Sequence, residues 1–126
     1  MRNHRKLIAW QRADDLAVKI YEVTGRFPAD ERFGIISQVR RAGVSVAANI
    51  AEGCGRETVV DFRRFLHQAR GSLYEVEYYI HLSGRLGYVQ PIEQEALTSQ
   101  CSEAAKVLQG FINSLNRQVK QGRAVN

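Results

Sequence analysis

A stripe of basic and aromatic residues in the second half of the chain is the part of the sequence best suited to holding a ligand. Its members follow one another at intervals of 4, 3, 4, 4, 3 and 4 residues: Arg63, His67, Arg70, Tyr74, Tyr78, His81 and Arg85. Side chains at such intervals share one face of an α-helix. Basic groups contact phosphates, and aromatic rings stack on unpaired bases. The stripe therefore indicates a surface suited to nucleic acid.

Two other interpretations of the stripe stay open. Tyr and Arg are also enriched where subunits meet, so packing against another copy of the chain is the interpretation that we favour for the stripe. Glu75 and Glu77 lie on the same predicted helix and would repel phosphate, which favours the subunit interface. The third interpretation is a solvated surface. Arg64 flanks the stripe and Arg56 lies in the preceding loop, and both are further candidates for either contact.

A polar pair, Asn49 and Glu52, lies just before the glycine loop at residues 53–55. The two residues are three apart, so they share a helical face. One interpretation makes them a functional polar site. The other makes them structural partners that tie down the loop and the next helix, because buried polar groups need hydrogen-bond partners. We favour the structural role, with Arg56 pairing with Glu52 or Glu57.

The residues show no catalytic or metal-binding arrangement. Carboxylate-bridged di-metal bundles need two Glu-x-x-His pairs, whereas Glu77 and His81 are four apart and have no counterpart. Zinc needs a cluster of ligands, but Cys54 lies in the glycine loop and Cys101 at a helical core position. The glycine loop also lacks the Gly-Lys-Ser/Thr ending of a phosphate-binding P-loop. We expect a protein that is not an enzyme and uses no cofactor or metal.

The elements that carry these residues are four amphipathic helices. Apolar residues recur every three or four positions and predict helices over Leu7–Gly25, Asp30–Glu52, Thr58–Leu86 and Pro91–Gln118. Gly53 is expected to stop the second helix, and Thr58 to cap the third with Asp61 three residues later. The fourth helix has a predicted apolar seam of Leu97, Cys101, Ala104, Leu108, Phe111 and Leu115.

Short loops between long helices force neighbours to run antiparallel. The sequence therefore predicts an all-α fold, an antiparallel up-down-up-down four-helix bundle. The 126 residues suffice for one domain, with the bundle at about 7–118 and polar tails at both ends.

The distribution of charge and the number of cysteines suggest which kind of partner and which cellular compartment suit the protein. The net charge is +5, of which residues 1–12 carry +4 and residues 119–126 carry +2, so the body carries −1. A basic protein is suited to an anionic partner, and arginine outnumbers lysine by 14 to 4. Two isolated thiols fit a reducing compartment, and no apolar run of about 18 residues predicts a membrane span. We expect a cytoplasmic protein with no membrane partner.

Several segments resemble a known family. They are NIAEG at Asn49–Gly53, Arg56, the run FRRFLHQARGSLYEVE at Phe62–Glu77, and Leu86-Gly87-Tyr88. In these the chain resembles the bacterial four-helix-bundle proteins encoded in intervening sequences of large-subunit ribosomal RNA genes. The likeness covers roughly Leu7 to Arg117. For most members of that family no activity is established.

The resemblance implies a homo-oligomer, with a pentamer favoured, and a role with nucleic acid. Relatives include the accessory variability determinant of diversity-generating retroelements, a basic pentameric barrel that binds nucleic acid and its reverse transcriptase. The resemblance thus also implies a protein partner of unknown identity. The leading hypothesis is a non-enzymatic homo-oligomer that binds RNA or DNA through Arg-rich surfaces. The alternative is a purely structural or protein–protein scaffold with no nucleic-acid role.

Overall fold

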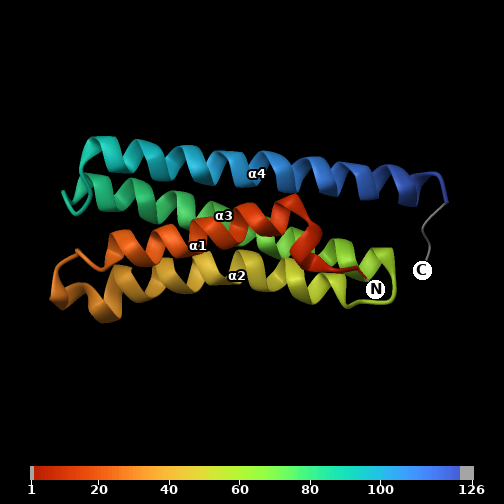
Figure 1. The fold of residues 1–126 in the computed structure, drawn as a ribbon, viewed down its shortest axis with the longest axis horizontal. Coiled ribbons are helices and arrows are strands. Elements are labelled where there is room, and N and C mark those ends of the chain that lie inside the picture. Colours follow the sequence, from red (N-terminus) through yellow and green to blue (C-terminus); the bar gives the residue numbers. More distant parts are fainter. Residues whose placement is uncertain (1, 123–126) are drawn as a thin grey trace.

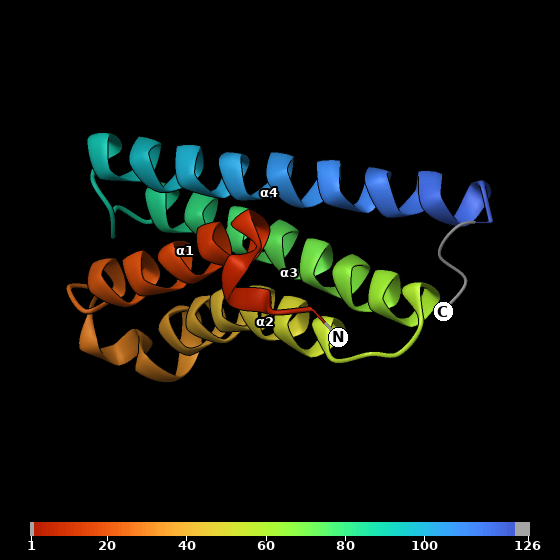
Figure 2. The same ribbon diagram turned by 45° about the vertical axis from the view of Figure 1, so that its right-hand side comes forward.

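Four long helices make up the computed structural model, which describes residues 2–122. They are α1 (Ile8–Thr24), α2 (Ser37–Cys54), α3 (Val59–Arg85) and α4 (Pro91–Lys120). Figures 1 and 2 show that α1 and α3 run one way and α2 and α4 the other. Residues 2–122 contain no strand. The expected all-α, up-down-up-down bundle is confirmed.

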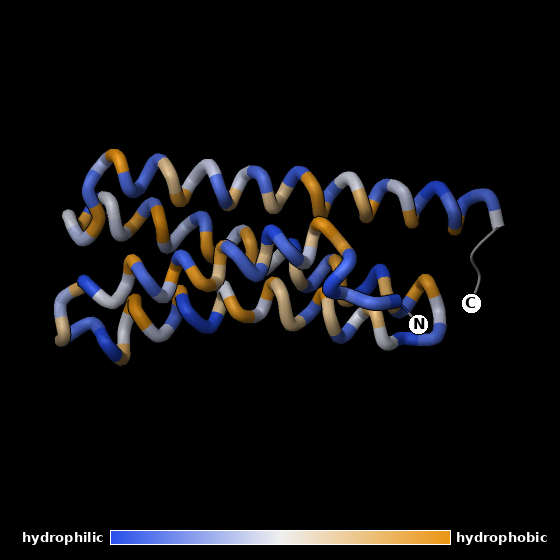
Figure 3. The backbone as a smooth tube through the Cα atoms, in the orientation of Figure 1, coloured by the Kyte–Doolittle hydropathy of each residue, from blue (hydrophilic) through white to orange (hydrophobic). Residues whose placement is uncertain are grey.

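The core is built from one apolar seam on each helix. Figure 3 shows the result as apolar positions that alternate with polar ones along every helix. Large side chains that are fully buried include Leu16, Ile50, Phe62, Leu73 and Leu108. Full burial of such a side chain contributes about 2 kcal/mol, so these seams dominate the stability of the fold.

The second helix starts later than the sequence predicts. A short 3₁₀ turn, Ala29–Glu31, and a π turn, Arg32–Ile36, precede it, in place of a regular helix from Asp30. Gly34 has φ −105° and ψ −117°, outside helical values, so the α-helical hydrogen bonding is interrupted there. Regular α-helix begins only at Ser37.

The other end of α2 also differs from the prediction. The helix does not stop at Gly53 but continues through Cys54. Gly53 is buried, and a Cβ there would lie 2.8 Å from Cδ1 of Phe62, so this glycine allows α2 and α3 to approach closely. Cys54 is the last residue of α2 and 2% exposed; the expectation of a loop cysteine was wrong.

On α4 the predicted seam shifts by one residue near its end. Ile112 is fully buried, whereas Phe111 is half-buried with its ring 5.5 Å from that of Phe62. The observed core steps from Leu97 to Leu108 and on to Ile112 and Leu115. An α-helix has about 3.6 residues per turn, so a strict 3-4 alternation drifts and a second step of four restores the inward direction.

The N-terminal segment, predicted as a polar tail, folds back over the bundle (Figure 2). The backbone N–H of Arg2 donates to the carbonyl of Cys54 at 3.2 Å, and the guanidinium of Arg2 lies 4.7 Å from the ring centre of Phe62. At the other end, α4 extends to Lys120. Arg123, the last basic residue of the predicted C-terminal tail, lies outside the described residues.

Candidate nucleic-acid interface

Helix α3 positions the stripe. Its 27 residues begin after Thr58, whose hydroxyl accepts the backbone N–H of Asp61 at 3.1 Å, so the expected cap is present. The buried seam of α3 faces the core, and the stripe lies on its outer side next to α4. The hydrogen bonds of Arg63 and Arg70 to α4, and the recess that the tyrosines line with residues of α4, show this placement.

Two arginines of the stripe are held by amides of α4. Arg63 donates to Oδ1 of Asn116 at 3.1 Å, and Arg70 donates to Oε1 of Gln109 at 2.9 Å. Gln109 in turn donates to Oδ1 of Asn113 at 2.9 Å. These acceptors are neutral, so they orient the guanidinium groups without cancelling their charge. No carboxylate within residues 2–122 forms an ion pair with either arginine.

His67 lies between these two arginines in the stripe, and their positive charges act on its imidazole. Desolvation lowers the pKa of its imidazole, and the charges of Arg70 and Arg63 lower it further. Removal of the imidazole from water is thus the larger cause of the lowered pKa, and the two arginine charges are the smaller one. We call Arg63, His67 and Arg70 the cationic half of the stripe.

The aromatic half consists of Tyr74, Tyr78 and His81. The two tyrosines are 62% and 56% exposed, so their rings are accessible to a ligand. Together with Glu77 and with Gln94 and Thr98 of α4, they line an open recess of about 410 Å³.

The two acidic residues of α3 differ in their surroundings. Glu75 forms an ion pair with Arg41 of α2 at 2.8 Å, and this pair raises the pKa of the arginine. Glu77 lines the aromatic recess and forms no ion pair among residues 2–122. The repulsion that Glu75 would exert on a phosphate is thus largely offset by Arg41.

Arg56 and Arg64 lie in a different environment from the stripe. Arg56 pairs with Glu52 at 2.9 Å and with Asp61 at 3.8 Å, and Arg64 pairs with Asp61 at 2.7 Å. Both guanidinium groups lie over the ring of Phe65, at 4.5 and 4.6 Å from its centre. They form a locally neutralised cluster at the α2–α3 turn. Arg85, at the far end of the stripe, is exposed.

Asn49 and Glu52 do not bond to each other. The Asn49 amide donates to the carbonyl and the hydroxyl of Ser45, at 2.9 and 3.0 Å. Ser45 in turn hydrogen-bonds the hydroxyl of Ser72 on α3 at 2.9 Å. Asn49 therefore belongs to a polar network between α2 and α3, while Glu52 bonds across the turn to Arg56.

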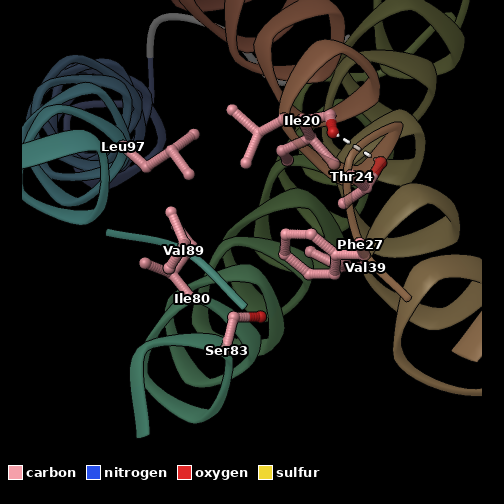
Figure 4. Close-up of a pocket in the computed structure, with 9 residues that line it drawn as sticks. Ile20, Thr24, Phe27, Val39, Ile80, Ser83, Val89 and Leu97 are labelled. Atoms are coloured by element: carbon pink, nitrogen blue, oxygen red, sulfur yellow. Dashed lines mark hydrogen bonds between the residues drawn. The ribbon is translucent and has the colours of Figure 1, made fainter. Parts of the chain in front are cut away.

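A small gap between the helix ends leaves no room for a ligand. This gap is lined by apolar side chains and two hydroxyls (Figure 4). Its volume is about 10 Å³, close to that of one water probe. The hydroxyls of Thr24 and Ser83 already donate to the carbonyls of Ile20 and Tyr79, each at 2.7 Å.

Within residues 2–122 no three side chains of metal-ligating type gather into a cluster. None of the helices in this range combines the length and apolarity that crossing a bilayer requires. Both thiols are free and buried, and burial, followed by the charge of Glu77, raises the pKa of Cys101 to about 11. A thiol with such a pKa is a poor nucleophile.

The sequence matches the family model described as 23S rRNA-intervening sequence protein over residues 5–110. The chain belongs to this family. It is also similar to the crystal structure of a protein of unknown function from the S23 ribosomal protein family of Bacteroides thetaiotaomicron. The TM-score is 0.75 and the identity 26%, over 83% of this chain and 98% of that one. No curated protein matches the chain.

The family match covers the whole stripe but only Gln109 of the α4 amides beside its arginines, because Asn113 and Asn116 lie beyond residue 110. The charged and aromatic residues of the sequence did not predict these amides. Gln109, Asn113 and Asn116 recur at intervals of four and three residues. That spacing was a usable signal for a polar ridge on one face of α4. This spacing did not enter the prediction of the site, because amides carry no charge and the prediction rested on charged and aromatic residues.

Proposed function

We propose that this member of the family is a non-enzymatic homo-oligomer that binds RNA or DNA along the outer surface of α3 and α4. One observation carries the proposal: Arg63 and Arg70 are oriented by neutral amides and keep their full charge. The charges of both arginines also act on His67 between them, where they lower the pKa of the imidazole after burial, the larger cause.

The arrangement suits phosphate binding for a physical reason. A guanidinium uses only part of its five donors on one amide oxygen, and the remaining N–H groups can form a paired contact with a phosphate. Because the amides already restrict both side chains, less rotamer entropy is lost when the anion binds.

Self-association has a separate candidate surface on α1 and α2. Val18 and Tyr21 on α1 and Val44 on α2 are 54%, 47% and 45% exposed, and Ala48, one turn after Val44, is exposed as well. Apolar side chains grouped on a surface favour contact with another protein. Covering this strip with a second copy would leave the stripe on α3 free. The pentamer that the family resemblance implies is the assembly we propose.

The test is the salt dependence of binding, measured by fluorescence anisotropy with a labelled thirty-nucleotide RNA and its DNA counterpart. Each lost phosphate contact lowers the slope of log affinity against log salt by about 0.7 for single strands. The double variant Arg63→Gln, Arg70→Gln should therefore lower the slope by about 1.4. Arg12→Gln, which removes an exposed charge that pairs with Glu103, is the control and should leave the slope unchanged.

Light scattering on the same variants separates this proposal from the scaffold alternative. Under the proposal, the double variant keeps the mass of the wild-type oligomer. If the oligomer dissociates instead, the stripe is a subunit interface and the protein is a scaffold.

A further inference from the structure

We propose that the aromatic recess binds one unpaired nucleobase, with guanine preferred, so that the protein selects single strands. The recess lies between α3 and α4 and is lined by Tyr74, Glu77, Tyr78 and Gln94 among others. This inference rests on the proposed function, because the cationic half of the stripe would hold the neighbouring phosphates. A base site explains three features that phosphate binding leaves without a role.

The first feature is the exposure of two tyrosines beside a recess. Tyr74 and Tyr78 are one helical turn apart, about 6 Å along the axis, and both expose more than half of their surface. Such rings offer stacking faces to a base that is not paired within a duplex. Arg70 precedes Tyr74 by the same single turn, so a phosphate on the arginine and a base on the tyrosine lie within reach of one nucleotide.

The second feature is the carboxylate of Glu77. It lines the recess and has no cationic partner among residues 2–122, although it weakens the positive field that a phosphate would prefer. A carboxylate accepts hydrogen bonds, so the ligand that fits it carries N–H donors. Guanine presents two adjacent N–H donors on its Watson–Crick edge, which match the two carboxylate oxygens. Uracil presents a single N–H between two carbonyls and fits poorly.

The edge of the recess is completed by Gln94, whose side-chain amide lies against Gly84 of α3. A Cβ at Gly84 would overlap the side-chain amide of Gln94. The glycine thus allows the amide of α4 to lie directly against α3. An amide supplies both a donor and an acceptor, which complements a base edge that carries both.

The third feature is Gly71, an exposed glycine in the interior of α3. No heavy atom lies within 4 Å of the position that its Cβ would take, so packing within the chain does not account for it. Glycine destabilises a helix interior relative to alanine. Gly71 lies one turn before Tyr74 and one turn after His67, where it leaves open space between the cationic and aromatic halves. That space suits the sugar that connects a bound phosphate to a bound base.

The test uses labelled ten-nucleotide strands in anisotropy titrations: oligouridylate, the same strand with one central guanosine, and both again as DNA. A duplex that contains the guanosine strand is the fifth probe. The guanosine strand should bind about tenfold more tightly than oligouridylate, as one well-formed base contact allows. Equal gains in RNA and DNA support readout of the base alone, and a larger gain in RNA supports an added 2′-hydroxyl contact.

Three variants assign the effect to the recess. Glu77→Gln should abolish the guanosine preference without weakening binding of oligouridylate, whereas Glu22→Gln on α1 should change neither. Tyr74→Leu should weaken both single strands about tenfold, and Tyr74→Phe should restore them because a phenyl ring still stacks. Circular dichroism confirms that each variant keeps its helical fold.

The outcomes separate this inference from the proposed function. If the duplex binds as tightly as the single strands, or if Glu77→Gln keeps the guanosine preference, the base site is wrong while phosphate binding along the stripe stands. If no strand binds at any salt concentration, both the inference and the proposed function are overturned.

Discussion

Arg63 and Arg64 are neighbours in the chain, yet their surroundings differ completely. Arg64 belongs to the turn cluster, where Asp61 neutralises it and Phe65 lies beneath its guanidinium. Arg63 points to α4 and bonds to the neutral amide of Asn116. Adjacent helical residues differ in direction by about 100°, so one helix can serve two different surfaces. The charge of the partner, rather than the number of arginines, therefore decides which surface attracts an anion.

The largest expected effect comes from removing one arginine pair or the other. Arg63→Gln, Arg70→Gln should weaken nucleic-acid binding about 100-fold at low salt, because two hydrogen bonds to charged groups are lost at roughly 1.5 kcal/mol each. Arg56→Gln, Arg64→Gln removes the same charge from the turn cluster and should change affinity less than about threefold. Anisotropy titrations measure both. Equal losses would show that only net charge matters.

A second prediction concerns a substitution that would give Arg63 a carboxylate partner like the one that Arg64 has. Asn116→Asp places a carboxylate at the acceptor of Arg63 and creates an ion pair like that of Arg64 and Asp61. We expect stability to rise by about 0.5 kcal/mol, as for other exposed pairs, and nucleic-acid affinity to fall about tenfold. Chemical denaturation and anisotropy give the two values. A variant that gains stability and keeps full affinity would contradict the role assigned to the amide.

A smaller effect on affinity is expected from alanine substitutions at two exposed helix glycines, one of which serves as the control for the other. Gly71 and Gly110 both have open space around the Cβ position, so alanine at either site should stabilise the protein by about 1 kcal/mol. Only Gly71→Ala should also weaken binding of single strands, by about fivefold, because Gly110 is on α4 outside the stripe. Thermal denaturation and anisotropy measure the pair. Unequal stabilisation, or equal losses in affinity, would remove Gly71 from the base site.

The smallest expected effect depends on pH. The pKa of His67 lies below its ordinary value of about 6.5 in the free protein, so its imidazole is neutral at pH 7. A bound phosphate would counter the charges of Arg63 and Arg70 and raise this pKa, so binding takes up a proton. Affinity should therefore rise about threefold as the pH falls from about 7.5 to about 5.5. His67→Gln should reduce this pH dependence, and an unchanged profile in that variant would exclude the histidine as its source.

Most of the fold could be predicted because helical periodicity is a local property. Four apolar seams and short connections were enough for the bundle, and Thr58 was recognised as the cap of α3. The errors lie where packing overrides local pattern. Gly34 interrupts the start of α2, Gly53 serves close packing against Phe62 rather than a helix end, and the 3.6-residue period directs Ile112 inward instead of Phe111.

The spacing of seven basic and aromatic residues is enough to place them on one face of a long helix, because direction around a helix depends only on position in the chain. What that face contacts depends on how the helices pack. The acceptors of Arg63 and Arg70 lie 53 and 39 residues further along the chain, and they meet α3 only through the register in which the two helices pack. The same register brings Gln94 to the recess beside the tyrosines. Direction along a helix is a local property, whereas the partner of a side chain depends on packing between distant segments.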